Sequence, residues 1–172
     1  ASISLGRLGP IADDQLIAMA TLLPGYEPEY YSRPPIAVTV CLGQIAKHRR
    51  CDDGTFEFLL LGLQRASVKH EISPVRSYRR AAVELLREEE VSDKHVALAL
   101  GKSLIDRVSV STRQFQKLLP PFQEGEISLS TLTDAVAQHA ELGLRAKIEL
   151  LQELSSESRA RMLLDLLPQS RF

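Results

Sequence analysis

A predicted β-hairpin constrains the fold of this chain more than any other feature of its 172 residues. In residues 36–42 apolar side chains recur at every second position, the pattern of a half-buried strand. Asp53-Gly54 follows, and Gly54 allows the positive φ that a hairpin reversal requires. Residues 56–61 are apolar at nearly every position, which predicts a strand covered on both faces, and Gly62 predicts a bulge or a barrel bend.

The expected pairing of this hairpin bears on disulfide and metal chemistry. If Asp53-Gly54 is a two-residue turn, Cys41 and Cys51 lie about ten residues apart along one strand, beyond disulfide reach. We therefore expect free, reduced thiols, which suit a reducing compartment. His48 and Cys51 are the nearest pair of good zinc ligands, but the pairing places His48 opposite Leu59. No metal site is predicted.

After residue 92 the apolar residues recur with the spacing of an α-helix. Apolar residues recur every fourth position from Val96 to Val108, and Asp93 is a predicted N-cap. Pro120-Pro121 is expected to stop this helical section. Serines can start two later helices, at 128 or 130 and at 155 or 156. Residues 88–90 are three glutamates and predict a solvated charge run that ends the β part. The fold class is therefore α+β, with a β subdomain at 1–91 and a helical bundle at 92–172.

Three tyrosines gather in the segment before the hairpin. The prolines of residues 26–35 exclude a helix or an inner strand, so we expect an ordered loop that carries Tyr26, Tyr30 and Tyr31. Tyrosine offers a large contact area with a polar end, which suits a protein-binding surface. The alternative is that these rings close one end of a barrel.

Several short motifs follow one another in a characteristic order. They are Arg33-Pro34-Pro35-Ile36, Cys41-Leu42-Gly43-Gln44-Ile45, Asp53-Gly54-Thr55, Leu61-Gly62-Leu63-Gln64-Arg65-Ala66 and Tyr78-Arg79-Arg80-Ala81-Ala82-Val83-Glu84-Leu85-Leu86. Residues 141–167 add two Leu-rich helical stretches. In order and spacing, most of residues 13–167 resembles the amino-terminal, substrate-binding (LON) domain of Lon proteases. Residues 1–12 match neither opening strand of that family, so its first strands are either missing from this chain or replaced.

The resemblance implies a PUA-like β barrel followed by a small helical bundle. It implies a non-catalytic domain that captures unfolded or tagged polypeptide segments, either for an AAA+ protease or as a free-standing adaptor, as in a stand-alone bacterial member. Apolar surface on the barrel and at the barrel–helix junction would make the contacts. The substrate-binding residues expected on this basis are Tyr26, Tyr30, Tyr31, Arg33 and Arg65.

The sequence contains few residues in the patterns that catalytic motifs require. Gly101-Lys102-Ser103 lacks the earlier glycine of a P-loop, since position 96 is Val, and it falls inside a predicted helix. The chain contains no Gly-x-Ser-x-Gly elbow and no Ser-Lys protease segment. We therefore expect no catalytic residues, no cofactor and no enzyme activity of its own.

Charge and hydropathy narrow the choice of partners. The formal net charge is −1 and neither half is markedly basic, which argues against a nucleic-acid footprint. The basic stretch Lys47-His48-Arg49-Arg50 keeps an RNA-binding PUA-like barrel as the alternative function. No apolar run approaches the roughly 18 residues of a membrane span, and no leader is visible, so a cytoplasmic location is expected.

Overall fold

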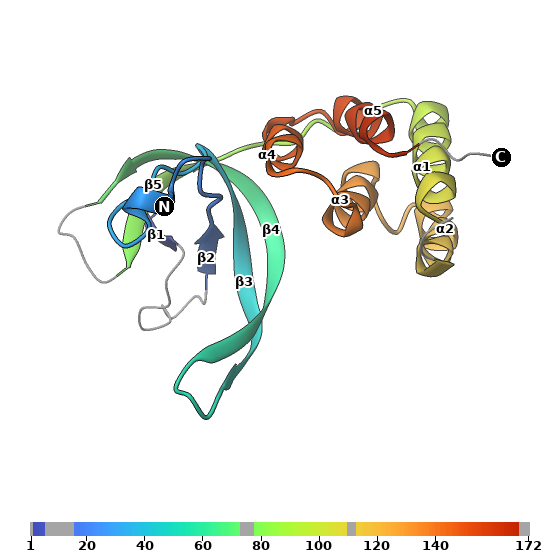
Figure 1. The fold of residues 1–172 in the computed structure, drawn as a ribbon. Helices are drawn as coiled ribbons and strands as arrows, with labels where there is room; N and C mark the ends of the chain where they lie inside the picture. Colours follow the sequence, from blue (N-terminus) through green and yellow to red (C-terminus); the bar gives the residue numbers. More distant parts are fainter. Residues whose placement is uncertain (1, 6–15, 73–77, 110–112, 169–172) are drawn as a thin grey trace. The chain divides into compact units, whose positions relative to one another are not determined.

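The computed structural model describes residues 2–5, 16–72, 78–109 and 113–168. It divides the chain into two compact units, Ala1–Leu86 and Arg87–Phe172 (Figure 1). The sequence placed the boundary five residues later, after Val91.

The first unit is a closed barrel with the strand order β1-β2-β3-β4-β5. Its strands are β1 (Ser2–Leu5), β2 (Leu16–Met19), β3 (Thr39–Arg50), β4 (Phe56–Glu71) and β5 (Arg79–Leu85). The β1–β2 pair is parallel, and the other pairs are antiparallel. Because β1 pairs with both β2 and β5, it closes the barrel at the edge where the sequence showed no recognisable strand.

The hairpin between β3 and β4 has a three-residue loop instead of the expected two-residue turn. The Cys51 N–H donates to the Thr55 carbonyl at 2.8 Å, and the Gly54 N–H donates to the Cys51 carbonyl at 3.0 Å. Gly54 has a φ of 83°, and the Asp53 carboxylate accepts the Thr55 N–H at 2.9 Å. The longer loop moves the register by one residue, so His48 lies opposite Phe58 and not Leu59.

Bulges bend the two long strands. The register shifts between Leu42 and Gly43, which faces Gly62, and this confirms the bulge predicted at Gly62. A second shift lies between Ile45 and Lys47. A Cβ on Gly43 would lie 2.6 Å from Leu60 Cγ, so glycine is required there for the strands to pair closely.

Alanine, valine and leucine side chains fill the barrel. The buried cluster consists of Ala18, Val40, Leu42, Ala66, Ala81 and Val83. The predicted alternation of residues 36–42 holds at Val40 and Leu42, but it is wrong at Val38, which is exposed. The reason is that β3 begins only at Thr39, after a bend at Val38.

The second unit is helical. Its elements are α1 (Lys94–Ser109), the 3-10 segment η2 (Arg113–Leu118), α2 (Leu119–Gln123), α3 (Leu129–His139), α4 (Leu144–Gln152) and α5 (Ser156–Leu166). Their shared core consists of Leu100, Leu104, Ile105, Phe115, Phe122, Leu129, Leu132, Val136, Leu150, Ala160, Leu163 and Leu167. Three predicted N-caps are confirmed. Asp93 accepts the His95 N–H at 2.8 Å, Ser128 the Thr131 N–H at 3.1 Å, and Ser155 the Ser158 N–H at 3.3 Å.

Pro120-Pro121 was predicted to end a helical section, and this was wrong. The two prolines lie in the first turn of α2, where the missing N–H groups have no helical acceptor to lose. Phe122 of α2 packs against Gly101 of α1, and a Cβ at Gly101 would lie 2.1 Å from the Phe122 ring. Gly101 is therefore a helix-packing position.

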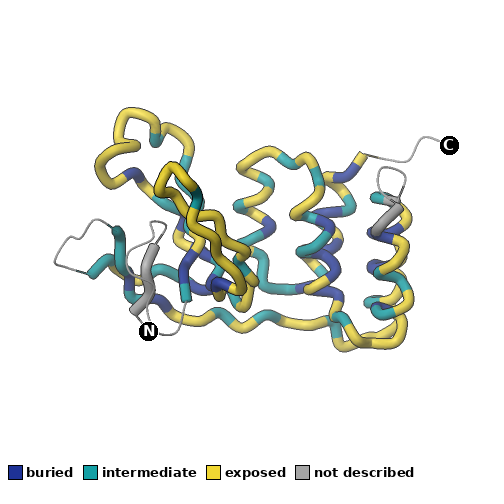
Figure 2. Tube along the Cα trace, turned by 90° about the horizontal axis from the view of Figure 1, so that it is seen from below, coloured by how far each residue is buried: buried dark blue, intermediate teal, exposed yellow. Residues whose placement is uncertain are grey.

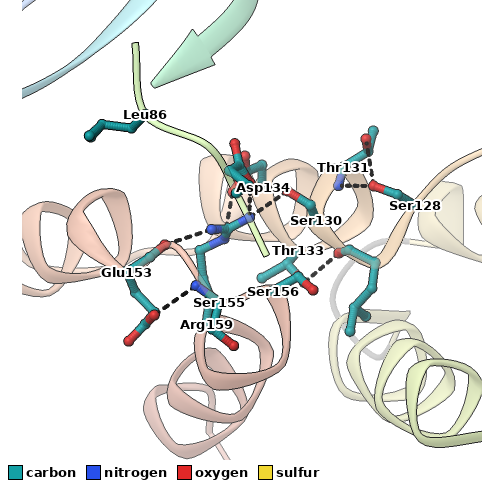
Figure 3. Close-up of polar contacts among 12 residues, drawn as sticks. Leu86, Ser128, Ser130, Thr131, Thr133, Asp134, Glu153, Ser155, Ser156 and Arg159 are labelled. Atoms are coloured by element: carbon teal, nitrogen blue, oxygen red, sulfur yellow. Dashed lines mark hydrogen bonds and ion pairs between the residues drawn. The ribbon is translucent and has the colours of Figure 1, made fainter. Parts of the chain in front are cut away.

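A buried arginine organises the helical unit (Figure 3). Arg159 of α5 is 0% exposed, and its guanidinium donates to Glu88 Oε2 at 2.6 Å and to the Glu153 carbonyl at 2.6 Å. It also donates to Ser130 of α3, while Asp134 lies 3.2 Å from Nε. Glu88 was expected in a solvated charge run. Its pairing with Arg159 instead ties the start of this unit to α3 and α5.

Replacement of Arg159 should be costly, because it leaves the Glu88 carboxylate without its guanidinium partner. We expect Arg159→Ala to lower the free energy of unfolding by roughly 3–5 kcal/mol. Arg161→Ala is the matched control, since it removes only an exposed pair with Glu157 and should cost less than about 1 kcal/mol. Urea unfolding followed by circular dichroism measures both, and equal losses would contradict this role of Arg159.

Two arginines flank Glu71 at the end of β4. Arg79 donates to Glu71 from both Nε and Nη2, and Arg33 Nη2 lies 2.9 Å from Glu71 Oε2. The hydrogen bonds from Arg79, followed by the positive charges of Arg79 and Arg33, lower the pKa of Glu71 from its ordinary 4.5, against the opposing effect of burial. The ionised carboxylate is therefore favoured by folding.

This lowered pKa predicts a stability that depends on pH. The contribution is fully present above the ordinary pKa of 4.5 and is lost as the pH falls through the lower pKa of the folded state. We expect Glu71→Gln to flatten the loss of thermal stability on acidification below about pH 4.5. Glu84→Gln is the control. Glu84 pairs with Lys69 at an exposed position, so about 1 M salt should screen its effect. An unchanged acid profile for Glu71→Gln would contradict the prediction.

Candidate functional site

The two long strands of the barrel continue past their neighbours as an arm. β2 pairs with β3 only at Cys41–Gln44, and β5 pairs with β4 only at Ala66–Glu71. Residues 45–63 therefore form a two-stranded ribbon, here called the β3–β4 arm, which extends beyond β2 (Figure 1).

Apolar side chains cover the β4 side of this arm. Five of them are between 37% and 60% exposed: Phe56, Phe58, Leu59, Leu61 and Leu63. Figure 2 shows the arm exposed over most of its length. The prediction of a strand covered on both faces was wrong. Within the described part of the first unit, this stretch of β4 pairs with β3 alone, and no second layer buries its faces.

The apolar residues occupy both faces of β4. Successive side chains of a strand point to opposite faces, so Phe56 and Phe58 share one face and Leu59 and Leu61 share the other. Single exposed leucines are common on protein surfaces, whereas a continuous exposed apolar row marks an interaction site. The β3–β4 arm is therefore the candidate binding surface.

The opposite strand of the arm is basic. Arg49 is paired with Glu57 across the ladder. Lys47, His48 and Arg50 make no side-chain hydrogen bond or ion pair with any residue that the structure describes. The arm thus places two cationic groups, Lys47 and Arg50, that have no partner among the described residues beside an apolar row.

The predicted tyrosine site is a small exposed aromatic cluster around the 3-10 turn η1 (Glu27–Glu29). The ring centroids of Tyr26 and Tyr30 lie 6.0 Å apart, and those of Tyr30 and Tyr31 lie 5.1 Å apart in an edge-on arrangement. Tyr31 is 93% exposed, and Tyr30 is also exposed. The exposure of Tyr30 and Tyr31 disfavours the alternative in which these two rings close the barrel, whereas Tyr26 is partly buried.

The two predicted binding arginines lie in different environments. Arg33 is partly exposed and pairs with Glu71 near the tyrosine segment. Arg65 is only 6% exposed, in the ladder position opposite Cys41. Its assignment as a binding residue stays a prediction, and its burial favours a role inside the barrel.

The described residues contain no cluster of metal-binding side chains. No three His, Cys, Asp or Glu side chains in this part of the chain come close enough to hold a metal ion. His139 stacks edge-on with Phe115 at 5.1 Å, and Ser103 of the Gly-Lys-Ser sequence donates to the Ala99 carbonyl within α1. None of the helices in the described ranges is both long and apolar enough to cross a membrane.

The sequence did not predict the exposure of the arm, because that exposure depends on β3 and β4 being much longer than the strands beside them. β4 has 16 residues and β3 has 12, against 4 in β2 and 7 in β5. An apolar run that lies opposite Lys47-His48-Arg49-Arg50 is also a poor fit to a doubly buried strand, because the partner strand is charged. Of these two features only the charged partner strand is visible in the sequence, and it does not by itself determine which residues are exposed.

Comparison with known proteins agrees with this architecture. Residues 12–169 match the family described as the ATP-dependent protease La (LON) substrate-binding domain. A Lon protease of Brevibacillus choshinensis is 26% identical over 168 residues, which cover 94% of this chain and 21% of that protein. The chain therefore spans about a fifth of the length of that relative.

Solved structures share the fold. The N-terminal domain of a Mycobacterium avium complex Lon protease matches with a TM-score of 0.67 and 15% identity, covering 99% of this chain and 100% of that one. A Lon N-terminal domain protein from Xanthomonas campestris matches with a TM-score of 0.58 and 16% identity, covering 98% and 99%. With a family match over nearly the whole chain and a closed barrel followed by a helical unit, this chain belongs to the LON substrate-binding domain family.

Proposed function

We propose that this chain is a non-catalytic domain that binds unfolded polypeptide segments through the β3–β4 arm. The observation that carries the proposal is the exposed apolar row of the arm, which runs from Phe56 to Leu63. Unfolded proteins display apolar side chains without a fixed shape. A flat, open apolar surface can accept many such segments, at the expense of affinity for any one of them.

The tyrosine cluster is a second contact surface in this proposal. Tyr30 and Tyr31 offer large, rigid rings with polar ends, a composition that is enriched where proteins bind partners. Arg33 lies two residues further along the chain and supplies a charge at the border of the cluster.

The family name and the Lon protease relative support a role in ATP-dependent proteolysis. In that role the chain delivers bound segments to ATPase and protease modules of Lon type. These lie either in the same polypeptide or in a partner that the chain serves as a free-standing adaptor. The proposed setting is the cytoplasm, where substrates are reduced and unfolded proteins are cleared.

Removal of arm leucines should weaken the binding of unfolded protein. We expect Leu59→Ser combined with Leu61→Ser to raise the Kd for a reduced, carboxymethylated and therefore unfolded protein on the order of tenfold, because two exposed apolar contacts are lost. Leu144→Ser is the control, since Leu144 is exposed to a similar degree on α4 of the helical unit. Fluorescence anisotropy measures the Kd, and equal binding by both variants would contradict the proposal.

Salt separates this function from the RNA-binding alternative. Apolar contacts survive screening, so raising the salt from about 50 mM to about 200 mM should change the Kd for unfolded protein by less than about threefold. Binding of single-stranded RNA through about four to six phosphates would weaken roughly a hundredfold over the same range. Tight and steeply salt-dependent binding of single-stranded RNA, without binding of unfolded protein, would favour the alternative.

A further inference from the structure

The two outer edges of the β3–β4 arm differ in chemistry. The β3 edge carries Lys47, His48, Arg49 and Arg50, and charged side chains are how proteins protect an unpaired edge from strand addition. The β4 edge carries an apolar row in which Glu57 is the one charged residue between Phe56 and Leu63. The β4 edge is therefore the less protected of the two.

The hairpin loop determines which backbone groups of β4 point outward. Cys51 uses both its N–H and its C=O within the hairpin, bonding Thr55 and Gly54. Hydrogen-bonded and non-bonded pairs alternate along an antiparallel ladder, so the next pair, Arg50 with Phe56, is non-bonded. The same alternation makes the pair of His48 with Phe58 non-bonded. The N–H and C=O groups of Phe56 and Phe58 consequently face the open side of β4.

No strand of the described residues pairs with this side. The β5 ladder starts at Ala66, and the Leu86 N–H bonds the Arg65 carbonyl, so the covered part of β4 begins there. Unpaired donors and acceptors spaced along an extended backbone are complementary to one class of partner, another extended polypeptide.

Charge narrows the class of that polypeptide. Residues opposite each other in the ladder share a face, so Arg50 lies beside Phe56 on one face and Lys47 lies beside Leu59 on the other. A strand added to β4 lies two strand spacings, about 10 Å, from β3, a distance that a glutamate and an arginine side chain span together. Both free cations are thus placed to receive carboxylates of a segment that covers the apolar row.

We propose that the open edge of β4, from Phe56 to Leu60, takes up an extended apolar and acidic polypeptide segment as an added β-strand. The inference rests on the proposed function and specifies its mode. Backbone hydrogen bonds supply affinity that does not depend on sequence, the apolar row selects apolar side chains, and Lys47 and Arg50 favour segments that also carry Glu or Asp.

A proline at an outward-facing position tests the backbone contribution. Phe58→Pro removes one outward N–H while the bonds of Glu57 and Leu59 to β3 remain, and Phe58→Ala removes the ring but keeps the N–H. The probe is a fluorescein-labelled peptide of alternating Val and Glu. We expect Phe58→Pro to bind it on the order of fivefold to tenfold more weakly than Phe58→Ala. Equal binding by the two variants would overturn strand addition.

Modified peptides test the contribution of backbone hydrogen bonds on the unaltered chain. This test does not depend on whether the proline variant folds. One peptide carries N-methyl groups on every Val, and a second carries them on every residue. Strand addition predicts that the second binds about tenfold or more weakly than the first, because alternate methylation leaves one edge of the added strand able to pair and full methylation leaves none. A third peptide with Gln in place of Glu should bind several-fold more weakly, and equal affinity would overturn the acidic preference.

The remaining outcomes separate this inference from the proposed function. If the unfolded protein binds but the two N-methylated peptides bind alike, the domain captures side chains only and strand addition is wrong. If neither the unfolded protein nor the parent peptide binds, the proposed function fails. A dimer in sedimentation that Phe58→Pro abolishes would assign the β4 edge to a second copy of this chain and overturn the inference.

Discussion

The unequal lengths of the barrel strands govern what the first unit can do. A closed barrel needs every strand to pair on both sides, and here β1, β2 and β5 are short while β3 and β4 run on. The surplus length pairs only with itself, and the bulges beside Gly43 and after Ile45 accommodate its change of course. The consequence is a ribbon whose two edges pair with no other strand that the structure describes and whose side chains are largely exposed. Exposure of Phe56, Phe58 and the neighbouring leucines follows from that geometry rather than from any special composition.

The second unit is held by a different interaction. Its helices share an apolar core, yet Arg159, a fully buried cation, joins Glu88, Ser130 and the Glu153 carbonyl in one hydrogen-bonded cluster. A buried guanidinium is tolerated because acceptors surround it, and it makes the relative placement of α3, α5 and the segment after β5 specific. The barrel unit thus carries the proposed contact surfaces. The helical unit is built for a defined packing.

Much of the fold could be predicted from local chemistry. The N-caps at Asp93, Ser128 and Ser155 and the bulge at Gly62 were each read from residues that act on their immediate neighbours. Predictions failed where the role of a residue depends on a partner that is distant in the sequence. A Pro-Pro pair can stop one helix or start another, and only the fold showed that Pro120-Pro121 starts α2. Glu88 is indistinguishable from its neighbours in the sequence until Arg159 is placed. The tyrosines were correctly singled out as an aromatic cluster, whereas Arg65 proved to be buried.

The sequence by itself determined the family, the α+β class and the hairpin, because motif order and hydrophobic period are local properties that survive without coordinates. It could not determine that residues 56–63 are exposed. An apolar run has the same pattern whether it is covered on both faces or extends beyond its sheet, since periodicity records which side chains alternate and not what lies opposite them. Only the tertiary structure showed where β2 and β5 stop pairing, and that boundary turns a predicted core strand into the candidate binding surface.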